Sequence, residues 1–108
     1  MRRMINKDIP WEATTGSVYI TNNQTTVRKN EIGQKELKIS FTGVNGGSGV
    51  LITLPAWYAP LVDIPIEVKT VSGIVQARDL VLKTNGTIST QATVTLAPYV
   101  FRGFIVYI

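Results

Sequence analysis

Residues 36–54 read ELKISFTGVNGGSGVLITL, and this stretch indicates a β fold. At its start apolar and polar residues alternate strictly, with Leu37, Ile39 and Phe41 on one side, and the alternation resumes in VLITL. Successive side chains of a strand point to opposite faces, so this pattern is typical of a strand with one buried face. The glycine-rich segment between the two runs predicts a connection between two antiparallel strands.

The next alternating run, VDIPIEVK at residues 62–69, contains a proline. Its apolar residues, which we expect to face inward, are Val62, Ile64, Ile66 and Val68. Proline has no backbone N–H and cannot donate a hydrogen bond to a neighbouring strand. We therefore expect this strand to lie at the edge of a sheet, or the nitrogen of Pro65 to point away from its neighbour.

A β-hairpin is expected in the run LVLKTNGTIS, residues 80–89. Asparagine followed by glycine is typical of a type I′ turn, because both residues tolerate positive φ angles. Asn85 and Gly86 thus predict such a turn between a strand that ends at Lys83 and one that begins at Thr87.

The C-terminal run YVFRGFIVYI, residues 99–108, is largely apolar on both sides. One side carries Phe101, Ile105 and Tyr107, and the other carries Val100, Phe104, Val106 and Ile108. A strand with this pattern is covered on both faces. A chain this small has little material for a second cover, so we expect a neighbouring subunit to supply it.

Shorter strands are expected in SVYI, residues 17–20, in TTVRK, residues 25–29, and in TVTL, residues 93–96. The best helical candidate, IGQKELK at residues 32–38, reads as strand in its second half. Short strands at regular spacing predict an all-β fold, a small antiparallel β-sandwich or barrel of about 7–9 short strands.

The length and the distribution of charge predict one domain with a basic N-terminal arm. A chain of 108 residues suits a single domain. The net charge is +4, but Arg2, Arg3 and Lys7 lie in the first seven residues. The rest of the chain has eight basic and seven acidic residues. We expect a short basic arm at residues 1–10 and a nearly neutral β domain at residues 11–108, which argues against nucleic-acid binding.

The composition excludes much enzyme chemistry. Without cysteine or histidine the chain has no thiolate nucleophile, and it lacks the commonest metal ligand and the commonest general base near neutral pH. The seven carboxylates are scattered along the chain, so nothing supports a catalytic pair or a calcium site. No run approaches the roughly 20 apolar residues of a membrane span. We expect no catalysis, cofactor, metal site or membrane insertion.

The connection TLPAWYAP, residues 53–60, is predicted to be a rigid, packed corner. Pro55 ends the strand before it, and Pro60 stiffens the entry to the next strand. The aromatic side chains of Trp57 and Tyr58 give the connection a hydrophobic body of its own.

The order of ITLPAWYAP, LVLKTNGTIS and FRGFIVYI resembles the C-terminal head domains of bacteriophage tail-fibre and baseplate receptor-binding proteins of the siphophage type. Those heads usually carry an L-P-x-G-Y-x-P turn, then a strand with an asparagine-glycine or aspartate-glycine turn, and a final apolar strand. Their first turn is matched by Leu54, Pro55, Tyr58 and Pro60. Asn85 and Gly86 match the later one.

Two positions depart from that pattern, and one of them is Ala59, which stands where many members have arginine or lysine. Trp57 stands where the family usually has glycine. If the family turn needs a positive φ angle there, the corner must be strained or reshaped in this chain, because bulky residues avoid that conformation.

The resemblance implies a virion component at the phage tail tip, made in the host cytoplasm, that acts by binding and not by reaction. Heads of this family generally form trimers around a three-fold axis and bind saccharides of the host envelope. By the resemblance, the partners would be a host cell-wall saccharide, other tail or baseplate proteins and two further copies of the chain. Several weak sites on one particle would raise the avidity.

The candidate ligand-binding residues are Trp57, Arg78, Asp79 and Arg102, and each has a structural alternative. Trp57 could be a platform for a sugar ring, or could cap the core or a subunit contact. Arg78 and Asp79 could bind sugar hydroxyls or face solvent. Arg102 interrupts an apolar strand, which suits an interface ion pair, a polar layer in an oligomer or a ligand contact. Trp11 could pin the arm or contact a ligand.

Two rival functions are open. The first is a purely structural tail or baseplate subunit without a ligand of its own. The second is an oligonucleotide-binding barrel, which would need basic and aromatic residues interleaved on one strand face. The segment KELKISF alone offers too few of them.

Overall fold

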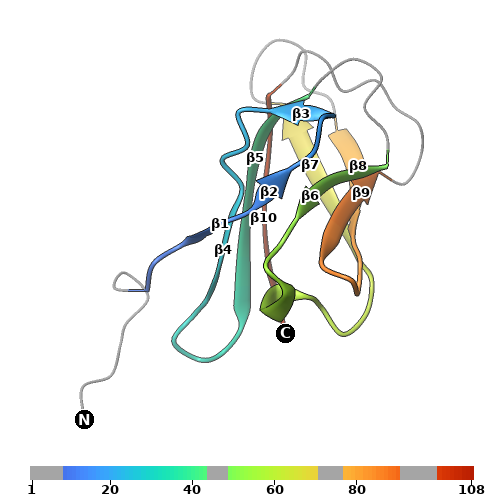
Figure 1. Ribbon diagram of the computed structural model, residues 1–108. Helices are drawn as coiled ribbons and strands as arrows, with labels where there is room; N and C mark the ends of the chain where they lie inside the picture. Colours follow the sequence, from blue (N-terminus) through green and yellow to red (C-terminus); the bar gives the residue numbers. More distant parts are fainter. Residues whose placement is uncertain (1–8, 44–48, 71–76, 91–99) are drawn as a thin grey trace.

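The computed structural model describes residues 9–43, 49–70, 77–90 and 100–108 (Figure 1). Most of the predicted basic arm and the predicted strand TVTL lie outside these residues. Within the described residues, ten strands form one sheet of antiparallel pairs: β1 (Glu12–Ala13), β2 (Thr15–Gly16), β3 (Ile20–Thr21), β4 (Thr26–Lys29), β5 (Lys35–Gly43), β6 (Val50–Thr53), β7 (Ile64–Thr70), β8 (Ala77–Leu82), β9 (Thr87–Thr90) and β10 (Val100–Tyr107). The all-β prediction is confirmed.

The sheet curls into a nearly closed barrel because its two edge strands are consecutive in the chain. The strand order is β1-β4-β5-β10-β7-β8-β9-β6-β2, with β3 paired to β5 off this path. Only Thr14 separates β1 from β2, so residues 12–16 pair with β4 at one edge and with β6 at the other. Thr14 Oγ1 donates to the carbonyl of Thr25 at 2.8 Å and accepts from Asn23 Nδ2 at 3.0 Å. These bonds hold the closing segment in place.

The predicted pairing across the glycine-rich segment was wrong. β5 pairs with β4, β10 and the short β3, whereas β6 pairs with β9 and β2. The alternation predicted the buried face of β5 correctly, since Leu37, Ile39 and Phe41 are all buried. The alternation could not predict which strand pairs with β5, because it shows only which side of a strand each side chain lies on.

The alternation in VLITL predicts Val50, Ile52 and Leu54 on one side of β6, and the structure differs from this prediction at Val50. A bulge between Val50 and Ile52 shifts the register, so Val50 is exposed while Leu51 and Ile52 are both buried. A bulge adds one residue to a strand and thereby changes the side on which the following side chains lie. Upstream, the predicted strand SVYI is mostly a turn, of which only Ile20 enters a strand.

The longest ladder joins β5 to β10, from the pair Lys35 and Tyr107 to the pair Thr42 and Val100. Its inner face carries the Phe41 and Phe101 rings, whose centroids are 5.6 Å apart, in the centre of the hydrophobic core. The outer face of β10 is not covered within the described residues: Phe104, Val106 and Ile108 are all exposed. A neighbouring subunit on this face stays a prediction.

β7 crosses close beneath β10 and then separates from it. The two strands pair only at Phe101 with Thr70 and at Arg102 with Lys69. Beyond that point, at Pro65, β8 is the only described strand that pairs with β7, so β7 is locally an edge strand among the described residues, as the proline predicts. The strand begins at Ile64, which leaves Val62 exposed and not inward as expected.

The hairpin between β8 and β9 is confirmed, but its turn differs from the prediction. Gly86 N–H donates to the carbonyl of Lys83 at 2.9 Å, and Lys83 N–H donates to the carbonyl of Thr87 at 2.8 Å. Gly86 has a φ angle of +83°, whereas Asn85 is not among the described residues with positive φ. A type I turn followed by a left-handed glycine has this form, and it replaces the predicted type I′ turn.

In the proline corner Tyr58 and Pro60 are buried, as expected of a packed connection, whereas Trp57 is exposed. Ala56–Tyr58 form a single 3₁₀ turn, η2, in which Tyr58 N–H donates to the carbonyl of Pro55 at 2.9 Å. Trp57 is not among the described residues with positive φ, so the corner needs no glycine at this position. Leu54 N–H donates to the carbonyl of Gly86 at 2.9 Å, which ties the corner to the hairpin turn.

Two tyrosines anchor the corner to the barrel. The buried Tyr58 donates its hydroxyl to the carboxylate of Glu12, and the Tyr107 hydroxyl donates to the carbonyl of Tyr58 at 2.7 Å. Burial, reinforced by the Glu12 carboxylate, raises the pKa of Tyr58 to about 12. Burial also raises the pKa of Tyr107. The fold therefore holds both hydroxyls in the neutral form.

The first prediction concerns alkaline pH. Tyrosine in an unfolded chain ionises near pH 10, so the stability that depends on the neutral Tyr58 hydroxyl is complete below about pH 10 and is lost as the pH rises toward 12. We expect the free energy of unfolding, measured by urea titration, to fall across this range. In Tyr58→Phe it should fall less steeply. Tyr19→Phe, at an exposed tyrosine, is the matched control. Identical pH profiles for all three proteins would contradict the role of Tyr58.

The second prediction concerns the crossing of β7 and β10. A Cβ atom added at Gly103 would lie 3.0 Å from Val68 Cγ1 and 3.3 Å from the carbonyl oxygen of Glu67. Gly103→Ala should therefore lower the free energy of unfolding by about 1–3 kcal/mol, as is usual for overpacking. Val18→Ile adds a methyl group to a side chain that is exposed in a turn, and should leave stability unchanged. Equal urea midpoints for both variants would show that the crossing tolerates a side chain.

Candidate functional site

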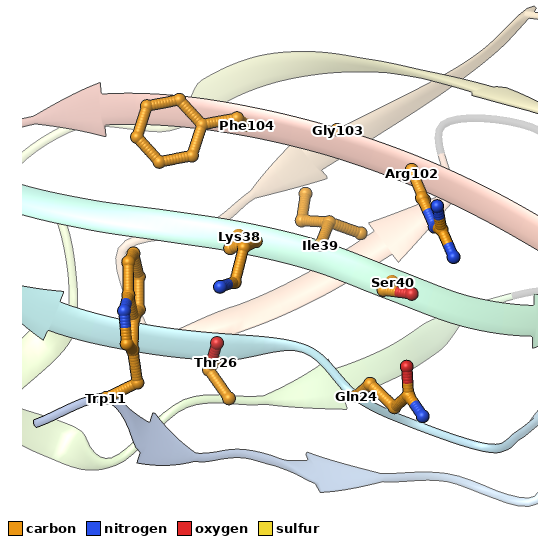
Figure 2. A pocket seen from close by; sticks show the side chains of 9 residues that line it. All are labelled: Trp11, Gln24, Thr26, Lys38, Ile39, Ser40, Arg102, Gly103 and Phe104. Carbon is orange, nitrogen blue, oxygen red and sulfur yellow. The ribbon is translucent and has the colours of Figure 1, made fainter.

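An open groove lies on the outer face of β4, β5 and β10, with a volume of about 730 Å³ (Figure 2). Its two aromatic side chains come from opposite ends of the chain: Trp11 precedes β1, and Phe104 lies on β10. Gln24, Thr26 and Ser40 contribute polar groups, and Lys38 and Arg102 contribute positive charge. The groove is thus amphipathic, with aromatic surface beside hydrogen-bonding groups.

The register of the strands explains how these residues come together. Lys38 on β5 is the neighbour of Thr26 on β4 and of Phe104 on β10, so these three residues form one row across the sheet. The next row pairs Ser40 with Arg102. Because side chains alternate along each strand, the inward-facing Ile39 between the two rows leaves Lys38 and Ser40 on the outer face. The groove follows directly from the long pairing of β5 with β10.

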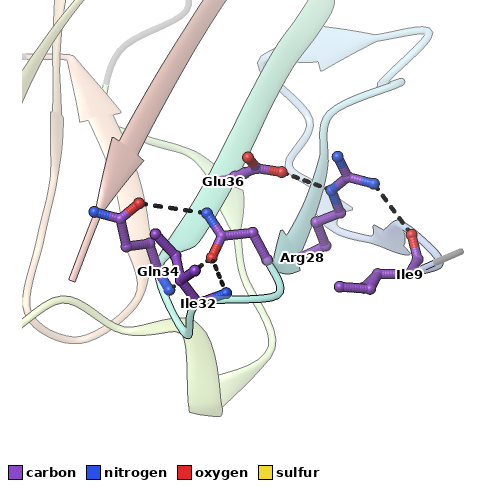
Figure 3. Close-up of polar contacts among 6 residues, drawn as sticks. Ile9, Arg28, Ile32, Gln34 and Glu36 are labelled. Carbon is purple, nitrogen blue, oxygen red and sulfur yellow. Dashed lines mark hydrogen bonds and ion pairs between the residues drawn. The ribbon is translucent and has the colours of Figure 1, made fainter. Parts of the chain in front are cut away.

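Trp11 is held over the sheet by two cations. The Arg28 guanidinium carbon lies 4.2 Å from the centroid of the Trp11 ring, and Lys38 Nζ lies 4.5 Å from the same centroid. Arg28 is itself fixed, since its Nε lies 2.6 Å from Glu36 Oε1 and its Nη1 donates to the carbonyl of Ile9 at 3.2 Å (Figure 3). Trp11 therefore both pins the N-terminal segment and forms part of the groove.

The groove is positively charged. Lys38 and Arg102 line it, and among the residues that the structure describes no aspartate or glutamate does. The carboxylate of Glu36, two residues before Lys38 on the same face of β5, is engaged by Arg28. Among the described residues, neither Lys38 nor Arg102 lies within ion-pair distance of a carboxylate. A ligand that carries negative charge would meet two cations here.

One polar atom of the groove residues has no partner in the described part of the chain. Thr26 Oγ1 is buried and makes no hydrogen bond. A buried hydroxyl without a partner is costly, and it is uncommon away from functional sites. Thr26 lies in the same row as Lys38 and Phe104, at the centre of the groove.

The structure places the predicted site residues in different regions. Arg102 lines the groove. Trp57 does not: it lies on η2, is 65% exposed and does not cap the core, although its ring centroid is 6.1 Å from that of Tyr58. Arg78 and Asp79 lie on β8, opposite Val68 and Glu67 of β7, and their side chains lie outside what the structure describes. The predicted residues therefore do not form a single site.

Several groove residues were not identified as candidates from the sequence. Phe104 was expected to be covered by a neighbouring subunit, and Lys38 and Ser40 were treated only as the polar side of a strand. Thr26 and Gln24 carried no signal at all. The alternation of the sequence shows that Arg102 and Phe104 lie on the same side of their strand. It does not show which residues of β5 lie beside them, because β5 and β10 are far apart in the sequence.

Exposed apolar side chains form a second notable feature. Figure 1 shows the β4–β5 connection, η2, the η2–β7 connection and the C-terminus at one end of the barrel. These segments carry exposed apolar side chains: Ile32, Trp57, Leu61, Val62 and Ile108. Lys35 Nζ donates to the carbonyl of Ala59 at 3.4 Å, which joins the start of β5 to the proline corner at this end. We call these five residues the apolar end.

Other kinds of site find no support among the described residues. They contain no group of three or more side chains suited to hold a metal ion. Within the same residues, no helix has the length and apolar character needed to span a membrane. Comparison of the chain with protein-family models and with curated proteins gives no match.

Proposed function

We propose that this chain is a bacteriophage tail or baseplate component whose β domain binds a host cell-surface saccharide in the groove between Trp11 and Phe104. The observation that carries this proposal is the combination of two aromatic side chains with a polar floor in one open groove. The aromatic rings offer apolar faces to the C–H groups of a sugar, and neighbouring polar groups can bind its hydroxyls. The protein acts by binding and catalyses no reaction.

The attribution to a phage tail rests on the resemblance of the proline corner, the hairpin turn and the closing strand to receptor-binding heads. In support, these three segments form one contiguous unit. Leu54 N–H of the corner bonds to Gly86 of the hairpin, and Tyr107 of the closing strand bonds to Tyr58 of the corner. The order of the motifs along the chain therefore corresponds to contacts in space.

The oligomer we propose is a trimer that uses the outer face of β10. Phe104, Val106 and Ile108 lie on this face and are exposed in the single chain. Phe104 also lines the groove, so in such a trimer each saccharide site would lie close to a subunit boundary. Three weak sites on one head, repeated over many heads, would give the avidity that attachment to a cell requires.

A structural tail or baseplate subunit is the alternative, and the apolar end favours it. Five exposed apolar side chains at one end of a small barrel suit a contact with another protein. An oligonucleotide is less well matched to the groove. A nucleic-acid channel follows the backbone with a line of cations, whereas this groove has only Lys38 and Arg102 free of carboxylate partners among the described residues.

The third prediction tests the groove. Trp11→Ala and Phe104→Ala should each weaken binding to isolated bacterial cell-wall polysaccharide, measured across a panel of hosts, by roughly tenfold, because each removes one aromatic contact. Trp57 lies outside the groove, so the Trp57→Ala variant should bind as the unmodified protein does. If Trp57→Ala alone loses binding, the site lies at the corner. If no cell wall is bound, the structural alternative gains support.

The fourth prediction tests the oligomer. Light scattering should give a mass close to three times the 11.9 kDa of one chain. Val106→Lys places a charge in the proposed interface and should yield a monomer with an unchanged far-ultraviolet circular dichroism spectrum. Lys83→Gln, at the exposed hairpin turn, is the control and should leave the mass unchanged. A monomeric mass for the unmodified protein at high concentration would contradict the proposed trimer.

A further inference from the structure

Lys38 and Arg102 are the only basic side chains among the described residues that line the groove. In the register of β5 and β10, Lys38 faces Phe104 and Ser40 faces Arg102. The two cations are therefore diagonal neighbours on one face of the sheet, at a typical separation of about 7–8 Å, which long side chains can bridge. The Ser40 hydroxyl is the immediate cross-strand neighbour of Arg102 on this face.

Nearby cations have partners of opposite charge, in contrast to these two. Arg28 pairs with Glu36 at 2.6 Å, and Lys69 lies 3.8 Å from Glu67. Two like charges side by side raise the free energy of the fold when no anion lies between them. In the described part of the chain, no carboxylate lies within ion-pair distance of Lys38 or Arg102, so a bound anion would lower this energy.

We propose that the saccharide bound in the groove is anionic, with a phosphate or carboxylate group held between Lys38 and Arg102. This inference rests on the proposed function and specifies its ligand class. Trp11 and Phe104 contact the sugar rings, and the two cations bind the charged substituent by charge-assisted hydrogen bonds. Arginine suits either group, because its planar guanidinium donates two parallel hydrogen bonds to carboxylate or phosphate oxygens.

The test compares neutral and charged sugars of matched structure. Binding of mannopentaose and of mannopentaose 6-phosphate is measured by calorimetry, together with galactotriose and the galacturonic acid trimer. We expect at least one charged member to bind about tenfold more tightly than its neutral counterpart, with a difference that shrinks at high salt. The phosphate and carboxylate pairs distinguish the two sources of negative charge.

Variants separate the contribution of charge from that of stacking. Arg102→Gln should weaken binding of the charged sugar by about tenfold and leave binding of its neutral counterpart unchanged. Lys38→Gln also removes a cation from the Trp11 ring, so it should weaken binding of both sugars, and that of the charged sugar more. Trp11→Ala should weaken both. Lys83→Gln removes one positive charge outside the groove and is the matched control, expected to bind both sugars as the unmodified protein does.

The possible failures are distinguishable. Equal affinity for neutral and charged sugars, unaffected by Arg102→Gln, overturns the anionic ligand and leaves the saccharide function standing. No affinity for any of the four sugars or for cell-wall polysaccharide overturns both. Retardation of a single-stranded oligonucleotide at moderate salt, abolished by Arg102→Gln, overturns both in favour of nucleic-acid binding.

Discussion

The fold depends on the pairing of residues 12–16 with both edges of the sheet. A curled sheet with two free edges would expose unpaired backbone groups on β4 and β6, which is a hazard for aggregation. Here one extended segment covers both, with β1 on β4 and β2 on β6, and with Thr14 between them fixed by Asn23 and Thr25. The same segment supplies Glu12, which accepts a hydrogen bond from Tyr58, so closure of the barrel and packing of the proline corner are mechanically connected.

This closure also creates the groove. Trp11 immediately precedes the closing segment, and its position over β4 and β5 follows from the pairing of β1 with β4. Arg28 contacts the Trp11 ring. It also donates to the carbonyl of Ile9 and forms an ion pair with Glu36, as Figure 3 shows. The groove is thus built on regular strands with supporting contacts, an arrangement that keeps binding groups better positioned than a loop does.

The alternating pattern predicted the all-β class and most buried faces, including that of β5, but not the strand partners. Local connection suggested that β5 and β6 pair, whereas a longer ladder with β10 occupies one edge of β5 and β4 occupies the other. The bulge at Val50 and the 3₁₀ turn at Trp57 arise from tertiary contacts that no period reveals. For the same reason Arg102 was identified as a candidate while Lys38 and Phe104 were not: the site exists only through the register of distant strands.

The two aromatic side chains of the groove come from positions 11 and 104, near the two ends of the chain. A partly synthesised or partly unfolded chain therefore has no site, and only the complete barrel is competent to bind. Any ligand of the groove must accordingly bind the native state in preference to the unfolded one, which makes occupancy and global unfolding thermodynamically linked. The protein with its groove occupied would then resist denaturation more strongly than the free protein.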